Sequence, residues 1–146
     1  MEVLILIGIQ GAGKSTFARR FADTHVRINL DMLKTRHREG LLFTACVEGK
    51  TRVLIDNTNV SREERRRYLE PARAAGFVVK GFYFSPVLDE CQGRNAGRPQ
   101  PIPEAALRNT LARLEPPSLT EGFTELHTVR IAGDDFAIEE YVDESQ

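Results

Sequence analysis

The sequence has 146 residues, of which 41% are hydrophobic, and a formal net charge of −1 at pH 7. These values predict one globular domain over residues 1–146, with an acidic tail from about residue 133. No apolar run approaches the roughly 20 residues of a membrane span, and the N-terminus lacks the basic segment of a signal peptide. Cys46 and Cys91 lie far apart and form no metal-binding pair. We therefore expect a cytoplasmic protein with no membrane partner and two reduced core cysteines.

Apolar runs alternate with helical patterns along the chain. The sequence predicts strands at residues 3–7, 26–30, 52–55, 77–84 and 124–131. Between them it predicts helices at 14–22, 31–49 (with a break at Gly40), 61–75, 85–97 and 103–114, and a loop at 98–103. Strands separated by helices are typical of a parallel sheet with right-handed crossovers. The predicted fold class is therefore α/β, a parallel five-stranded sheet flanked by helices in a single domain.

A glycine-rich segment with the spacing Gly-x-x-x-x-Gly-Lys-Ser follows the first strand and opens the first helix. That context is the one that a phosphate-binding loop, or P-loop, requires. Backbone N–H groups of such a loop converge on phosphate oxygens, and glycines let the backbone approach closely. Lys14 would reach the β- and γ-phosphates of ATP, and the Ser15 hydroxyl would bind Mg²⁺. The residues assigned to nucleotide binding are Gly8, Gly11, Ala12, Gly13, Lys14, Ser15 and Thr16. The motif alone does not separate a kinase from an ATPase or a switch.

Two carboxylates stand where predicted strands end. Asp56 has the position of a Walker B aspartate that holds Mg²⁺ or its water, although residues 56–59 are also rich in turn formers. Asp31 follows the second strand, and ligands bind at the carboxyl ends of strands in open α/β sheets. There it could accept a proton from an acceptor hydroxyl as general base, or cap the next helix. Residue type alone leaves both roles of Asp31 open.

Several cations accompany these carboxylates. Arg94 and Arg98 lie four residues apart near a predicted helix end, where they could form a lid that stabilises the transferred phosphoryl group, or simply be solvated. Lys34 and Arg38 follow Asp31 and could bind the backbone phosphates of a polyanionic acceptor. For the basic run 65–67, a solvated face paired with nearby glutamates is favoured over a binding patch.

Together these motifs resemble the 5′-kinase domain of the phage and animal polynucleotide kinases. The resemblance covers about residues 3–131. It is carried by the P-loop, by Arg-Ile-Asn-Leu-Asp at 27–31, by Val-Leu-Ile-Asp-Asn-Thr-Asn at 53–59, by residues 71–76, by Arg94-Asn95-x-x-Arg98 and by Pro-Ser-Leu-Thr-Glu-Gly-Phe at 117–123. The Asp-Asn-Thr-Asn and Glu-Gly-Phe pieces are its most specific parts.

The resemblance implies a kinase that uses ATP and Mg²⁺ to phosphorylate the 5′-hydroxyl of DNA or RNA, with the P-loop strand central in the sheet. It places the general base at Asp31 and the lid arginines at Arg94 and Arg98. The residues assigned to the acceptor are Asp31, Lys34, Arg38, Asn57 and Thr58. Leu30 departs from the family, in which many members have Arg. The sequence holds no Asp-x-Asp-Gly-Thr phosphatase motif, so a phosphatase or ligase acting with this chain would be a separate partner.

Two other functions remain open on the sequence. A small-molecule kinase for a sugar, nucleoside or antibiotic would keep the P-loop, Asp31 and the lid arginines without needing the basic residues after Asp31. An ATP-binding module without an acceptor would keep the P-loop alone. Transfer to an oligonucleotide, compared with transfer to nucleosides, separates these possibilities.

Overall fold

The computed structural model describes residues 1–86 and 88–142. The strands are β1 (Glu2–Ile7), β2 (Val26–Ile28), β3 (Val53–Ile55), β4 (Val78–Phe84), β5 (Glu125–Ala132) and β6 (Asp135–Glu140). The helices are α1 (Lys14–Ala18), α2 (Leu30–Leu33), α3 (Arg36–Glu48), α4 (Arg62–Ala74), α5 (Leu88–Ala96) and α6 (Glu104–Arg113), with 3-10 turns η1 (Arg19–Phe21) and η2 (Leu119–Glu121). None of the helices in these ranges is both long and apolar enough to cross a membrane.

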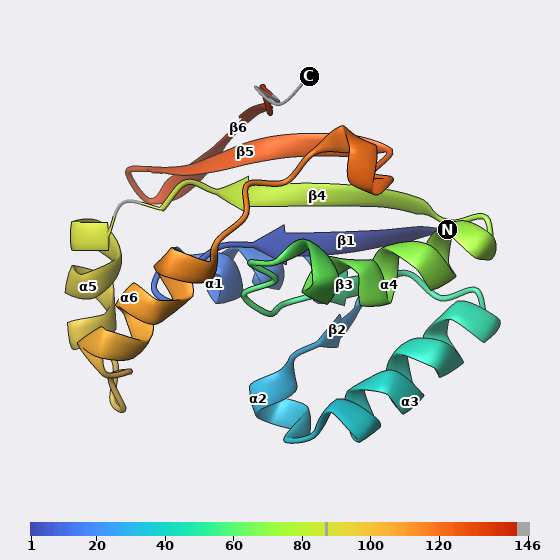
Figure 1. Ribbon diagram of the computed structural model, residues 1–146, viewed down its shortest axis with the longest axis horizontal. Coiled ribbons are helices and arrows are strands. Elements are labelled where there is room, and N and C mark those ends of the chain that lie inside the picture. The colour runs from blue at the N-terminus through green and yellow to red at the C-terminus, as the bar shows by residue number, and fades with distance from the viewer. Residues whose placement is uncertain (87, 143–146) are drawn as a thin grey trace.

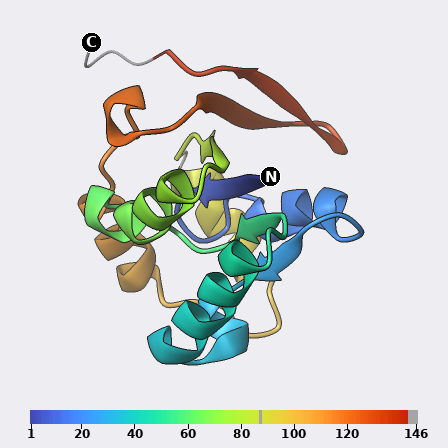
Figure 2. The same cartoon turned by 90° about the vertical axis from the view of Figure 1, so that its right-hand side faces the viewer.

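One sheet with the strand order β2-β3-β1-β4-β5-β6 organises the chain (Figure 1). The strands β1 to β5 are parallel, and β6 pairs antiparallel with β5. Helices cover both faces, as the view along the sheet in Figure 2 shows. The predicted α/β fold with a central P-loop strand is therefore confirmed. Beyond the carboxyl ends of β1 and β4 lie α5 and α6 (Figure 1).

The residues of β1 divide between two hydrophobic clusters, one on each face of the sheet. Val3, Ile5 and Ile7 pack in the cluster that contains the buried residues of α3 and α4. Leu4 and Leu6 pack in the cluster that contains those of α1. A parallel strand covered on both faces reads as an unbroken apolar run. The run at 3–7 therefore predicted the strand, and its central place agrees with what the family resemblance implied.

The predicted break at Gly40 is wrong, because α3 continues through that exposed glycine. The chain breaks earlier, at Lys34, which adopts a φ of 77° and separates α2 from α3. The Thr35 side chain then accepts a hydrogen bond from the backbone N–H of Arg38 at 3.1 Å and caps α3. A mid-helix glycine costs about 1 kcal/mol relative to alanine, which a helix with its own cap tolerates.

Part of the acidic tail predicted from about residue 133 forms the strand β6, after a turn in which Gly133 has a φ of 62°, and residues 143–146 lie outside the described residues. An aromatic residue within the acidic stretch explains the difference. The ring centroid of Phe136 lies 5.3 Å from that of Phe17, so β6 packs onto α1. Arg20 adds an ion pair with Asp135 and lies over both rings. The C-terminal hairpin therefore packs against the core through the partly buried Phe136.

Candidate functional site

The P-loop connects β1 to α1 and depends on glycine at two positions. Gly11 and Gly13 have φ values of 78° and 98°, a region that glycine adopts without strain. A Cβ at Gly11 would also lie 2.5 Å from the carbonyl oxygen of Cys91, because α5 packs directly on the loop. The N–H of Gly8 donates to the carbonyl of Thr58 at 2.9 Å, which ties the loop to the segment after β3. The loop is therefore closely packed on two sides.

Lys14 is buried within this loop. Its Nζ donates to the carbonyl oxygens of Gly8 at 2.8 Å and Ile9 at 2.7 Å. Burial lowers the pKa of the Lys14 ammonium to about 8, although the charges of Asp56 and Asp31 oppose that shift. Arg98 also acts on this ammonium and lowers its pKa further. The electrostatic coupling indicates that the P-loop, β3, α2 and the end of α5 face a common centre.

The structure brings Ser15 and Asp56 together at the carboxyl edge of the sheet. Ser15 Oγ lies 3.3 Å from Oδ2 of Asp56, whose side chain is only 2% exposed. The same oxygen also accepts from Arg27 of β2, with distances of 2.8 Å to Nε and 2.7 Å to Nη2. Hydroxyl and carboxylate oxygens are ligands that Mg²⁺ prefers, usually together with phosphate oxygens and waters. In the described ranges no group of three or more His, Cys, Asp or Glu side chains could hold a metal without such help.

Asp31 lies in the first turn of α2 but does not cap it. The cap is Asn29, whose Oδ1 accepts from the N–H of Met32 at 2.9 Å. The capping role left open for Asp31 is thus performed by its neighbour. Asp31 is exposed, and within residues 1–86 and 88–142 its carboxylate forms no hydrogen bond or ion pair. A free carboxylate at the carboxyl end of a strand is the arrangement that a general base needs.

A buried polar network fixes the turn that carries Asp31. The Asn57 side chain accepts from the N–H of Leu30 at 2.8 Å and donates to Glu39 Oε2 at 2.9 Å. Tyr68 donates to Glu39 Oε1 at 2.6 Å, and burial raises the pKa of the Tyr68 hydroxyl, which therefore keeps its proton. The amide of Asn57 thus binds the protein frame, and its predicted acceptor contact, like that of Thr58, stays a prediction.

The predicted lid arginines stand at the end of α5. Arg94 donates to the carbonyl of Gly11 at 3.2 Å, so it rests on the P-loop. Arg98 lies just after the helix and is exposed. The buried Asn95 closes the loop beyond them, because its side chain bonds both backbone groups of Ile102, at 2.6 and 2.9 Å. The helix predicted at 85–97 begins in the structure at Leu88, and Val87 before it lies outside the described residues.

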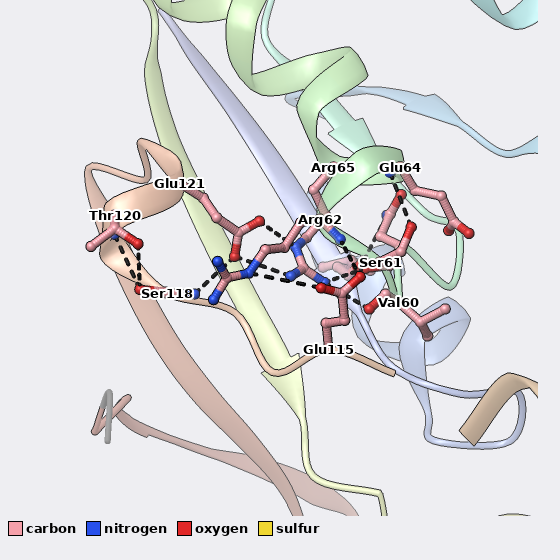
Figure 3. Close-up of polar contacts among 11 residues, drawn as sticks. Val60, Ser61, Arg62, Glu64, Arg65, Glu115, Ser118, Thr120 and Glu121 are labelled. Carbon is pink, nitrogen blue, oxygen red and sulfur yellow. Dashed lines mark hydrogen bonds and ion pairs between the residues drawn. The ribbon is translucent and has the colours of Figure 1, made fainter. Parts of the chain in front are cut away.

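The solvated face predicted for residues 65–67 is wrong at its first member. Arg65 is fully buried and forms a two-point ion pair with Glu121, at 2.8 and 3.0 Å (Figure 3). Its remaining donors bind the carbonyls of Asn59 at 2.9 Å and Val60 at 3.0 Å. The exposed Arg66, which pairs with Glu70, does follow the prediction.

A sequence signal for the buried arginine existed. Arg65, Tyr68, Leu69 and Ala72 share the i, i+3, i+4, i+7 spacing of one helix face, and all four are buried. The pattern therefore placed Arg65 on the core side of α4. Asn29 also had a signal, because asparagine caps helices as well as aspartate does. Arg27, in contrast, had none, because its contact with Asp56 depends on the pairing of β2 with β3.

Comparisons with known proteins agree with this geometry. A family model described as an AAA domain matches residues 3–117. The bifunctional polynucleotide phosphatase/kinase of Schizosaccharomyces pombe is 27% identical over 135 residues, which cover 88% of this chain and 33% of that protein. The L-seryl-tRNA(Sec) kinase of Methanococcus maripaludis is 25% identical over 135 residues, covering 79% of this chain and 53% of that protein. The chain thus spans about a third and about half of the length of these relatives.

A solved structure shows the same fold. Kti12 of Chaetomium thermophilum, crystallised with ADP-AlF3, superposes with a TM-score of 0.67 and 16% identity, covering 98% of this chain and 92% of that one. Because the family model matches well over half of the chain, the chain belongs to the AAA domain family and has the fold of a P-loop kinase-like domain.

Proposed function

We propose that this protein transfers the γ-phosphate of ATP to the 5′-hydroxyl of DNA or RNA. The observation that carries the proposal is the free carboxylate of Asp31, held on a fixed turn at the sheet edge where the P-loop also lies. The similarity to a polynucleotide phosphatase/kinase and to a tRNA kinase supports a nucleic acid as acceptor. Because the chain spans only part of these relatives, the proposal rests on the residues of this domain.

The phosphates of ATP would lie in the P-loop. Lys14 would leave the carbonyls of Gly8 and Ile9 and turn its ammonium to the β- and γ-phosphates. Ser15 and Asp56 would hold Mg²⁺, which when bound neutralises charge on the phosphate oxygens. Arg94 and Arg98, at the end of α5, would stabilise the charge that develops on the γ-phosphoryl group.

Asp31 would accept the proton of the attacking 5′-hydroxyl. As the oxygen bonds to the γ-phosphorus, the bond from that phosphorus to the β–γ bridging oxygen breaks and ADP leaves. Lys34 and Arg38 lie close after Asp31 and reach solvent. Their charges would bind backbone phosphates next to the reacting end. A small uncharged acceptor would not need them.

Transfer from γ-labelled ATP tests the proposal. With Mg²⁺ present, the acceptors would be a 5′-hydroxyl DNA oligonucleotide, its RNA counterpart, free nucleosides and seryl-tRNA. We expect transfer to an oligonucleotide and none to nucleosides. Transfer to nucleosides alone would establish the small-molecule kinase, transfer to seryl-tRNA alone an RNA-linked seryl hydroxyl as acceptor, and ATP binding with no transfer a module without an acceptor.

Asp31→Asn is the matched variant for the chemical step. Asparagine preserves shape but cannot take the proton, so the rate should fall by about 10² to 10⁴ while ATP binding is retained. Near-normal transfer by Asp31→Asn would contradict the assigned base.

Arg98→Ala should lower kcat more than it raises KM, because an interaction made in the transition state acts on kcat. Lys14→Ala, which removes the charge on the phosphates, provides the inactive control.

A further inference from the structure

The metal carboxylate assigned above already has a cationic partner, Arg27 of β2. We infer that Arg27 is a positioning residue that neutralises Asp56 in the metal-free protein and competes with Mg²⁺ for the Asp56 carboxylate. The inference rests on the proposed nucleotide-binding function, and it goes beyond that function in assigning a role to β2.

The contacts of Asp56 converge on one atom. Oδ2 accepts from Nε of Arg27 at 2.8 Å and from Ser15 Oγ at 3.3 Å, and Nη2 of the same guanidinium lies 2.7 Å away. An ionised carboxylate offers about two lone-pair positions on each oxygen. The two hydrogen bonds therefore fill Oδ2. A cation that takes Ser15 Oγ and this oxygen as ligands, directly or through a water, must displace a donor.

Burial explains why a partner is needed before any metal arrives. The Asp56 side chain is 2% exposed, whereas that of Arg27 is 41% exposed. An uncompensated charge on a buried carboxylate is costly, and a paired one is tolerated. Arg27 supplies the compensating charge from the solvent side. An arginine with this much exposure can be rehydrated when it leaves, so the exchange replaces one partner of Asp56 with another.

The structure also gives Arg27 a place to withdraw. Its side chain lines a pocket of about 320 Å³ between α1 and β2, together with Ser15, Arg19, Phe21 and His25. Because β2 is an edge strand, this movement requires no change in the core. The pocket runs up to Ser15, so Arg27 can release Asp56 while its main chain stays in the sheet.

Mg²⁺-dependent binding of a fluorescent ADP analogue tests the competition without measuring catalysis. The Mg²⁺ concentration at half-maximal binding would be compared for the wild type, Arg27→Met, Arg27→Lys and Arg19→Met. Removal of a half-exposed ion pair should lower the Mg²⁺ midpoint of Arg27→Met by about 1.4-fold to fivefold. Arg27→Lys, which keeps the charge but loses the two-point contact, should lie between Arg27→Met and the wild type. Arg19→Met removes a charge from the same pocket without touching Asp56 and should leave the midpoint near the wild-type value.

Each other outcome is decisive. An unchanged or raised midpoint in Arg27→Met would overturn the competition, and an equal shift in Arg19→Met would reduce it to the general field of the pocket. If the wild type binds the ADP analogue neither with nor without Mg²⁺, the proposed function fails and the inference fails with it. If the wild type binds normally and only the Arg27→Met shift is absent, the inference alone fails. Thermal unfolding in EDTA checks the folded state, where Arg27→Met should unfold at a lower temperature and recover with Mg²⁺ and ADP.

Discussion

Two arginines contact opposite ends of the segment between β3 and α4 (residues 56–61), and they do so in opposite ways. At its start, Arg27 meets the carboxylate of Asp56 on one oxygen and leaves the rest of its guanidinium in solvent. At its end, the fully buried Arg65 binds both oxygens of Glu121 and two main-chain carbonyls, one of them that of Val60. A guanidinium whose donors all bind groups inside the protein fixes a loop. A guanidinium that is partly hydrated can be replaced by another cation. The segment between β3 and α4 is thus fixed at Val60, whereas the cationic partner of Asp56, beside the P-loop, can be exchanged.

Removal of the buried arginine should give the largest effect. Arg65→Met removes the cationic partner of Glu121 and one donor to each of two carbonyls, and breaking a buried ion pair in this way costs about 3 to 5 kcal/mol of the free energy of unfolding. Urea denaturation measures it. Arg66→Met is the matched control, because Arg66 is exposed and its pair with Glu70 contributes less than about 1 kcal/mol. Equal losses in the two variants would show that the two-point ion pair of Arg65 is not a fixed clamp.

Lys14 offers a second comparison, because its buried ammonium binds two main-chain carbonyls in place of a carboxylate. Its pKa is about 8 in the folded protein, against 10.5 as the ordinary value. Between these values the unfolded chain binds a proton that the folded chain does not, so this group makes stability rise with pH over that window. Lys14→Met removes the cost, offset in part by the absence of two hydrogen bonds, and should be more stable at pH 7 by about 1 to 3 kcal/mol. The difference should fade by about pH 10 in urea denaturation at stepped pH. A constant difference would mean that Lys14 is not the titrating group.

The cap of α2 should give a smaller effect and separate two adjacent residues. Asn29→Ala removes the bond to the N–H of Met32 and a second one to the carbonyl of Asp56. We expect a decrease of about 1 to 2 kcal/mol in the free energy of unfolding, as for other removed caps. Asp31→Ala should change the free energy of unfolding by less than about 0.5 kcal/mol, as for surface substitutions. If Asp31→Ala were as destabilising as Asn29→Ala, Asp31 would contribute to the cap of α2, and its assignment as general base would be weakened.

The smallest effect concerns the cations at the open end of the site. Replacement of Lys34 and Arg38 by alanine should weaken oligonucleotide binding and flatten its dependence on salt by about 0.7 to 0.9 log units for each phosphate that is no longer neutralised. Binding titrations at four salt concentrations measure the slope. Alanine at Arg66 and Arg67 on α4 is the control and should leave the slope as it is. A slope insensitive to Lys34 and Arg38 would favour the small-molecule acceptor.

The fold and the P-loop followed from local patterns. The apolar run at 3–7, the glycine spacing from Gly8 and the carboxylates at strand ends are each read over a few neighbouring residues. The start of the helix predicted at 61–75 was equally local, since Ser61 Oγ caps α4 by accepting from the N–H of Glu64 at 3.1 Å. What sequence reasoning could not supply were partners brought from far along the chain. The pairs Arg27–Asp56 and Arg65–Glu121 join residues 29 and 56 positions apart.

The C-terminal hairpin has a consequence for how the protein behaves among copies of itself. Without β6, the outer edge of the sheet would be β5, whose unpaired N–H and C=O groups would be open to a strand from another chain. With β6 in place, the exposed edge carries charged side chains: Asp135 pairs with Arg20, Glu139 pairs with Arg130, and Glu140 is exposed. Charged side chains along an edge strand disfavour pairing with a strand from another chain. At the opposite edge, β2 has only three residues, too short a template for a stable ladder. The charged strand β6 thus disfavours edge-to-edge aggregation of the sheet.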